Sequence, residues 1–393
     1  MRARLERDFE RFRREQPTDV AAHVRDTYGV DLTASYLGEP IPHPIGKASG
    51  QLTLNAGQLE TDASAGLAFI VLKTVIAEDE SGERAMAAWA VPESRMRVER
   101  RTSADGREGW TVTWKGRGWD RTLDEYLQLV RAGRDITRAG GPLVVPSVKY
   151  HLPEGDLPFR DAEYRHTTAR IADAWGEGPL LLEKDFSPTL AGDERAGERA
   201  TILRWLAEVP ERIRAAAPRS ARVALKLMNA RFDDDFQVEM VAAARTADTL
   251  VVFNRLWDAE AGVAYGGWDL SERNLRVLGR VRSAGIAHPP LSGTGNVVSG
   301  RVLIDYARAG CTSVQVHTGF QLPRAEYPAE SGSRPALLMH RLLFDPRDGL
   351  IACMLELEAE GVLTRTAGEL RFLDLAAPPS AQAPSSKLIA NSQ

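Results

Sequence analysis

Short apolar runs alternate with longer amphipathic segments along most of this chain. Each run is short enough to be a buried strand, and apolar residues recur at helical spacing in the segments between, as in 122–133, 200–216 and 300–310. The eight candidate strands are residues 41–49, 68–75, 142–149, 179–185, 223–228, 249–254, 288–295 and 313–319.

Eight repeats of a strand followed by a helix are typical of a (β/α)8 TIM barrel, with a doubly wound open sheet as the alternative. We predict an α/β fold with this barrel over residues 31–375. A β-hairpin that turns at Asp105-Gly106 is expected as an insertion after the second strand, within about residues 76–120. Residues 1–30 are predicted to form a helical extension. The Pro-, Ser- and Ala-rich residues 376–393 are predicted to be a flexible tail.

Composition narrows the class of protein. The 393 residues carry 50 basic and 54 acidic side chains, a net charge of −4, and the two signs are interspersed, which argues against a nucleic-acid binder. Two cysteines cannot supply a disulfide framework or a cluster site, and the histidines lack metal-binding spacing, so no metal is expected. The charged start and the absence of an apolar run of about 18 residues predict a cytoplasmic protein without an integral membrane segment.

Polar residues recur where the predicted strands end. Lys73-Thr74, Lys149, the Glu183-Lys184-Asp185 run, Lys226 and Asn254 all lie at or near the last residues of their strands. A single lysine at such a position is most often a solvated residue at the rim of the sheet. Barrel chemistry gathers at the carboxyl ends of the strands, however, and several lysines there need an anionic or electron-rich ligand. A phosphorylated cofactor would meet that need.

Glycine loops follow the seventh and eighth strands. Ser292-Gly293-Thr294-Gly295-Asn296 precedes a predicted helix, and His317-Thr318-Gly319 ends the eighth strand. A tight turn explains one such loop equally well. In barrels, however, the loops after these two strands commonly hold phosphate, because glycine lets backbone N–H groups approach the oxygens. No Walker loop or GxGxxG fingerprint is present, which disfavours a Rossmann domain.

Over residues 30–320, these segments together resemble the dihydroorotate dehydrogenase family of FMN-dependent barrels. HPIGKASGQLTLNAG looks like the opening FMN segment of that family, and AFIVLKTV, ALKLMN and VVFN resemble three of its strands. The block LSGTGNVVSGRVLIDYARAGCTSVQVHTGF is similar to its FMN-phosphate module, and Gly266-Gly267 matches the preceding double glycine. The resemblance implies FMN as cofactor, bound by Ala48, Ser49, Gly50, Lys73, Thr74, Lys226, Asn254, Gly266, Gly267, Gly293, Thr294, Gly295, Asn296, His317, Thr318 and Gly319.

The resemblance also implies residues for chemistry. Ser187 falls on the position of the family's base, and Lys73 takes the place of a lysine near flavin and substrate. A serine hydroxyl is a poor base without a relay, and a Ser-Pro turn that leads into a helix is the alternative. Asn55 and Asn254 are candidate substrate-binding residues. Lys184 and Thr189 are also candidates, because they stand where the family has asparagines that hold dihydroorotate, and their presence argues against orotate chemistry.

We therefore expect an FMN-dependent oxidoreductase that moves a hydride between a small polar metabolite and flavin N5, at a CH–CH or CH–NH group. The charged residues at the mouth suggest a substrate with both acidic and amino groups. A genuine dihydroorotate dehydrogenase with an altered substrate clamp is one alternative, and a non-catalytic flavin- or phosphate-binding barrel is another. Beyond a small-molecule substrate, the partner left open is a second copy of the chain in a homodimer.

Overall fold

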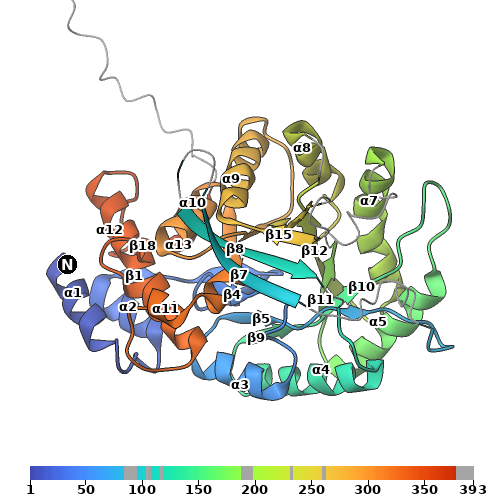
Figure 1. The fold of residues 1–393 in the computed structure, drawn as a ribbon, viewed down its shortest axis with the longest axis horizontal. Helices are drawn as coiled ribbons and strands as arrows, with labels where there is room; N and C mark the ends of the chain where they lie inside the picture. Colours follow the sequence, from blue (N-terminus) through green and yellow to red (C-terminus); the bar gives the residue numbers. More distant parts are fainter. Residues whose placement is uncertain are drawn as a thin grey trace, which may run out of the picture.

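The computed structural model describes residues 1–83, 95–102, 106, 108–115, 118–186, 198–230, 233–258 and 263–377. A ten-stranded parallel sheet curls through the middle of the molecule, and helices cover its outside (Figure 1). Its strands are β4 (Ile45–Lys47), β5 (Phe69–Val71), β6 (Val75–Ile76), β9 (Leu143–Val145), β10 (Ser147–Lys149), β11 (Leu180–Asp185), β12 (Ala221–Met228), β13 (Thr249–Asn254), β16 (Leu291–Thr294) and β17 (Cys311–Val316).

Each predicted strand segment overlaps at least one strand of this sheet. The second and third segments are each divided in two, into β5 and β6 and into β9 and β10. Pro146 separates β9 from β10, and it has no N–H with which to continue the ladder. The hydrogen-bonded order is β6-β10-β11-β12-β13-β16-β17-β4-β5-β9. The sheet is therefore an α/β barrel-like arrangement in which neighbouring strands follow the order of the chain.

Helices between the strands pack their apolar faces on the sheet. In Figure 1, α3, α4 and α5 lie along the lower side and α7 to α10 follow up the right side and across the top. Their bounds are α3 (Ala56–Ser64), α4 (Leu123–Arg138), α5 (Asp161–Trp175), α7 (Arg199–Ala216), α8 (Asp234–Ala243), α9 (Trp268–Ser283) and α10 (Gly300–Arg308).

Local sequence fixes where several of these helices begin. Thr122 and Glu125 form a reciprocal capping box at α4, and the Asp233 side chain accepts a hydrogen bond from the backbone N–H of Phe236 at α8. Ser299 caps α10 in the same way.

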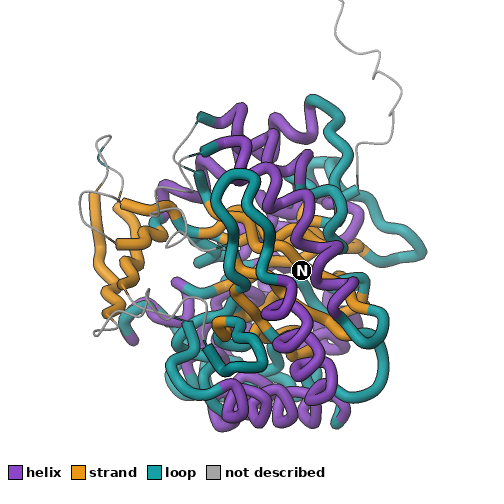
Figure 2. Tube along the Cα trace, turned by 90° about the vertical axis from the view of Figure 1, so that its right-hand side faces the viewer, coloured by secondary structure: helices purple, strands orange, loops and turns teal. Residues whose placement is uncertain are grey.

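An antiparallel sheet stands to one side of the main sheet (at the left in Figure 2). It consists of β7 (Arg95–Thr102), β8 (Glu108–Lys115), β14 (Leu256–Asp258) and β15 (Val263–Gly266), in the order β14-β15-β8-β7. The β7–β8 hairpin lies inside the insertion expected at 76–120, and Gly106 in its turn has a φ of 83°. Strands β14 and β15, which follow β13, were not expected from the sequence; β15 pairs with β8, and β14 pairs with β15.

The two ends of the described chain pack against each other. Helices α1 (Arg2–Arg11) and α2 (Val20–Tyr28) lie beside α11 (Arg334–Phe344) and α12 (Leu350–Ala359), and the Phe12 and Phe344 rings meet edge to face at 4.9 Å. The remaining short elements are β1 (Val30–Asp31), β2 (Ala34–Tyr36), β3 (Glu39–Ile41), η3 (Thr318–Gln321), η4 (Arg324–Glu326), β18 (Leu370–Arg371) and α13 (Phe372–Ala376). Of the predicted tail, Ala376 ends α13, and positions 378–393 lie outside the described residues.

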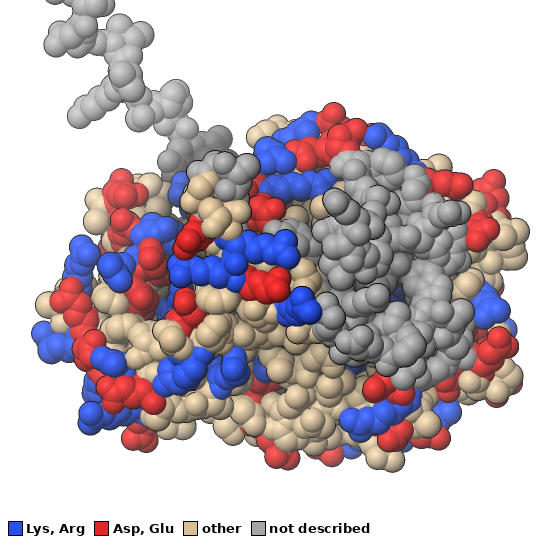
Figure 3. Space-filling view, in the orientation of Figure 1, with Lys and Arg blue, Asp and Glu red and all other residues tan. Residues whose placement is uncertain are grey.

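The surface and the helices agree with the charge pattern of the sequence. On the face seen in Figure 3, basic and acidic side chains are interspersed rather than gathered by sign. Among the residues that the structure describes, no helix combines the length and the apolar character needed to cross a membrane.

Candidate functional site

A cavity opens where the parallel strands end at their carboxyl side. It holds about 990 Å³ of empty space, part of it open to solvent. Fourteen residues predicted from the sequence line it: Ala48, Ser49, Gly50, Lys73, Thr74, Lys226, Asn254, Gly266, Gly267, Thr294, Gly295, Asn296, His317 and Thr318. The structure adds Gln51, Met96, Gly118, Lys149, Asp185, Phe253, Arg255, Ala264, Leu270, Val297 and Gln315.

Positive charge dominates the described part of the cavity wall. Lys73, Lys149, Lys226 and Arg255 line it, whereas Asp185 is the one carboxylate among the described lining residues. Burial, together with the positive charges of Lys149 and Arg255, lowers the pKa of Lys73 to about 7. Burial likewise lowers the pKa of Arg255 to about 10. Cations that destabilise one another in this way favour an anionic or electron-rich ligand.

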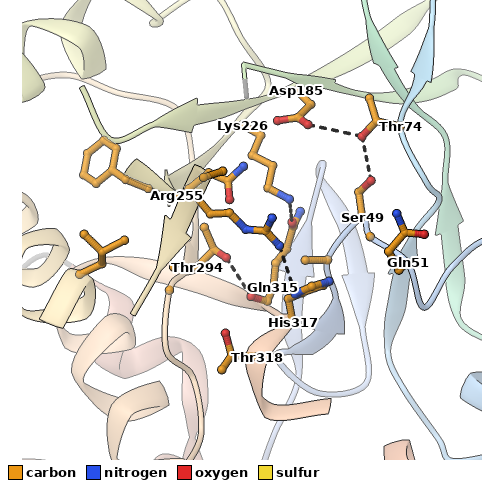
Figure 4. Close-up of a pocket in the computed structure, with 18 of the residues that line it drawn as sticks. Ser49, Gln51, Thr74, Asp185, Lys226, Arg255, Thr294, Gln315, His317 and Thr318 are labelled. Carbon is orange, nitrogen blue, oxygen red and sulfur yellow. Dashed lines mark hydrogen bonds between the residues drawn. The ribbon is translucent and has the colours of Figure 1, made fainter. Parts of the chain in front are cut away.

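Lys226 lies on the floor of the cavity, above a buried polar network. Its Nζ donates to Gln315 Oε1 at 3.2 Å and lies 3.7 Å from Glu183 Oε1 (Figure 4 shows Lys226 and Gln315). Glu183 is completely buried, and its other oxygen accepts hydrogen bonds from Tyr36 OH at 3.0 Å and from the Gln315 amide. Burial raises the pKa of Glu183, which the Lys226 charge opposes. The network holds the Lys226 ammonium at a fixed place facing the cavity.

A hydroxyl chain connects one wall of the cavity to Asp185. Ser49 Oγ lies 2.8 Å from Thr74 Oγ1, which donates to Asp185 Oδ2 at 3.4 Å (Figure 4). Burial alone would raise the pKa of Asp185, but the charges of Lys149 and Lys226 outweigh it and hold the pKa below its usual value. Asp185 is therefore a carboxylate anion at neutral pH.

The loop after β16 is held rigidly and has unusual backbone angles. Gly295 has a φ of 111° and Asn296 a φ of 53°. Tyr306 OH donates to the carbonyls of Thr294 and Gly295 at 2.8 and 3.0 Å, and the Asn274 amide donates to Thr294 O at 2.9 Å. Asn296 Oδ1 is buried and has no hydrogen-bond partner within the described residues. A loop with strained backbone angles that is held by several hydrogen bonds and contains an unsatisfied polar atom is typical of a binding site.

His317 directly follows β17, the strand that pairs with β16, and its position explains why residue 50 is glycine. A Cβ on Gly50 would lie 2.3 Å from His317 Nε2, so the chain passes the imidazole only because residue 50 is glycine. Burial, together with the charges of Arg255 and Lys226, lowers the pKa of His317 well below its usual value. The ring is therefore neutral, and its Nδ1 lies 3.4 Å from Arg255 Nη2 as an acceptor (Figure 4).

Lys184 and three other predicted residues do not line the cavity. Side chains alternate along β11, so Asp185 faces the cavity while Lys184 is buried on the other side, where its Nζ lies 4.2 Å from the Phe186 ring. Asn55 caps α3 by accepting from the backbone N–H of Gln58.

Gly293 and Gly319 instead allow close packing of neighbouring side chains. A Cβ added at Gly293 would lie 2.6 Å from the Tyr306 ring, and one added at Gly319 would lie 2.9 Å from Leu338. Ser187 and Thr189 lie outside the described residues.

Sequence reasoning missed Arg255 and Gln315, although both carried a signal. Gln315 is a buried polar residue between Val314 and Val316, and such a residue needs a buried partner. Arg255 directly follows Asn254 at a strand end, where barrel sites gather.

Comparisons with models of known protein families and with curated proteins find no match to this chain.

Proposed function

We propose that this chain is a closed (β/α)8 barrel that binds FMN and acts as an oxidoreductase. The strands at the two ends of the sheet order support closure. β6 and β10 stand at one end and β5 and β9 at the other, yet β5 and β6 belong to one chain segment and β9 and β10 to another. β5 pairs with β9 and β6 pairs with β10. Backbone bonds also join these segments beyond the strand ends, from Leu72 N to Val145 O at 2.9 Å and from Ala77 N to Lys149 O at 2.8 Å.

One observation carries the functional proposal: the glycine loops after β16 and β17 and the cations of four other segments border the same cavity. The orphaned Asn296 Oδ1 and the excess of positive charge both fit an anionic, polar cofactor. The described residues therefore fit FMN.

Different residues would hold the two ends of the cofactor. Gly295, Asn296 and Thr318 would hold the phosphate, next to the start of α10, whose dipole favours negative charge. Lys226 and Ser49 would face the ring system. When bound, FMN supplies hydride transfer, and the protein contributes orientation, electrostatics and proton handling.

Proton handling falls to Lys73 among the described residues. A pKa of about 7 allows its amine both to accept and to release a proton at neutral pH. Ser187 stays a prediction. Lys226 has a different role, because Gln315 and Glu183 hold its ammonium in place, where it would stabilise negative charge on an electron-rich ring. The substrate proposed for this site is a small polar metabolite.

The cofactor proposal is tested by binding FMN and riboflavin to the purified, flavin-stripped protein in parallel calorimetric titrations. The two ligands share the ring system and differ in the phosphate. We expect a yellow protein as isolated, and FMN binding that is at least about a hundredfold tighter than riboflavin binding, since several charge-assisted hydrogen bonds go to phosphate. A colourless protein that binds no FMN, or equal affinity for the two ligands, would overturn the proposal.

A further inference from the structure

We propose that Asp185 determines specificity, by selecting substrates that present an N–H group to this wall of the cavity and rejecting those that present a carbonyl oxygen there. The inference rests on the proposed function, because it concerns the substrate of the same cavity. It names the chemical class of that substrate as a small anion that carries an N–H donor.

The observation behind it is an unsatisfied atom. Asp185 is the last residue of β11, is 8% exposed and lines the cavity. Oδ2 accepts from Thr74 Oγ1 at 3.4 Å and lies 3.9 Å from Lys149 Nζ. Oδ1 is buried and has no hydrogen-bond partner in the described part of the chain. A buried carboxylate oxygen without a donor is costly, which indicates that a ligand supplies the donor.

The charge state of Asp185 fixes the polarity of that ligand group. Lys149 and Lys226 hold the side chain in its ionised form, and an ionised carboxylate only accepts hydrogen bonds. A carbonyl oxygen placed against Oδ1 would be repelled, because both oxygens carry negative charge. An asparagine at this position could turn its amide to meet either group, whereas the aspartate cannot.

The remaining part of the substrate follows from the cations that line the same cavity. Lys73, Lys149 and Arg255 also line it and favour an anionic group such as a carboxylate. A donor for Asp185 and an anion for these cations lie within reach of one small molecule. Amino and imino carboxylates have this combination.

Two matched pairs of probes test the proposal by calorimetry on the full chain as isolated. Pyrrole-2-carboxylate and furan-2-carboxylate have similar shapes and differ in whether the ring presents N–H or oxygen. L-Proline and tetrahydrofuran-2-carboxylate repeat the comparison with a charged amine. We expect at least one N–H probe to bind about tenfold or more tightly than its oxygen counterpart, because the oxygen probe leaves Asp185 unsatisfied.

The variant Asp185→Asn should abolish this preference, since its amide can donate to the ring oxygen. The same change at Asp135, which is on the exposed side of α4, is the matched control and should leave the preference intact. Equal affinities within both pairs in the natural protein, no binding of any probe at millimolar concentration, or an unchanged preference in Asp185→Asn would each overturn the proposal. None of these readouts depends on flavin, so failure to bind FMN refutes the proposed cofactor separately.

Discussion

Gly295 offers the sharpest single test of the loop after β16. Its φ of 111° is one that residues with a Cβ rarely adopt, so the change Gly295→Ala strains the backbone. The added methyl would also lie 2.8 Å from Asn274 Nδ2 and 3.2 Å from Tyr306 OH. Both groups belong to the hydrogen bonds that hold this loop, so neither can move without breaking them.

The expected cost has two parts. A non-glycine residue forced into this backbone region costs about 1–3 kcal/mol. Asn274 Nδ2 donates to Phe253 O at 3.1 Å and to Thr294 O at 2.9 Å, and losing one such bond costs about 1 kcal/mol. We therefore expect Gly295→Ala to lower the free energy of unfolding by about 2–4 kcal/mol. If the loop holds phosphate, the affinity for FMN should fall about tenfold or more, which corresponds to about 1.4 kcal/mol.

Urea denaturation and calorimetric FMN titration measure the two effects. The matched control is Gly279→Ala on α9, where the glycine is exposed and an added Cβ meets nothing within 4 Å. That change should be neutral or stabilise the protein by up to about 1 kcal/mol, because alanine is the better helix former. Equal urea midpoints for Gly295→Ala and the natural protein would refute the strain argument. Unchanged FMN affinity in a destabilised variant would refute the role of the loop in binding.

Three further predictions concern buried charges. Lys226→Met leaves the Glu183 carboxylate buried without its cation and should lower the free energy of unfolding by about 3 kcal/mol in urea denaturation. The double variant with Glu183→Gln should regain that stability but should not regain FMN retention. Because the pKa of Lys73 is about 7, its amine should reach half of its maximal rate of acylation by acetic anhydride near neutral pH, as measured by mass spectrometry. A pH midpoint of acylation near that of an ordinary lysine would contradict this. Burial raises the pKa of Asp62 to about 6 against the opposing charge of Lys47, so the folded state holds this proton more tightly than the unfolded state. Stability should therefore fall as the pH rises from about 4 to 6, and Asp62→Asn should flatten that dependence in urea midpoints measured across this range.

Much of the scaffold could be predicted from the sequence because its signals are local. Apolar runs marked each parallel strand. The hairpin turn at Gly106 needs a left-handed residue, which glycine supplies. These features depend on a few neighbouring residues, so they can be read without knowing the tertiary structure.

The parts that could not be predicted depend on contacts between distant segments. β15 pairs with β8 across more than a hundred residues of sequence, and nothing near residues 263–266 marks that partner. The orientation of β11 is a similar case, since its six residues are all buried and no polar alternation marks the inner face. The sequence pointed to Lys184, whereas Asp185, one position later, lines the cavity, and one position reverses the face of a strand.

The electrostatics of the cavity depend on this register. Were Lys184 at the cavity wall in place of Asp185, the described lining would carry no carboxylate among its lysines and Arg255. With Asp185 there, one carboxylate lies among four cations. Its Oδ2 lies 3.9 Å from Lys149 Nζ, so it lowers the free-energy cost of burying that ammonium. The lining still carries an excess of positive charge. Glu183, two residues earlier and on the same side of β11, offsets the Lys226 charge from below. One short strand thus supplies both carboxylates that make a cluster of buried cations tolerable, and the uncompensated charge is what a bound anion would neutralise.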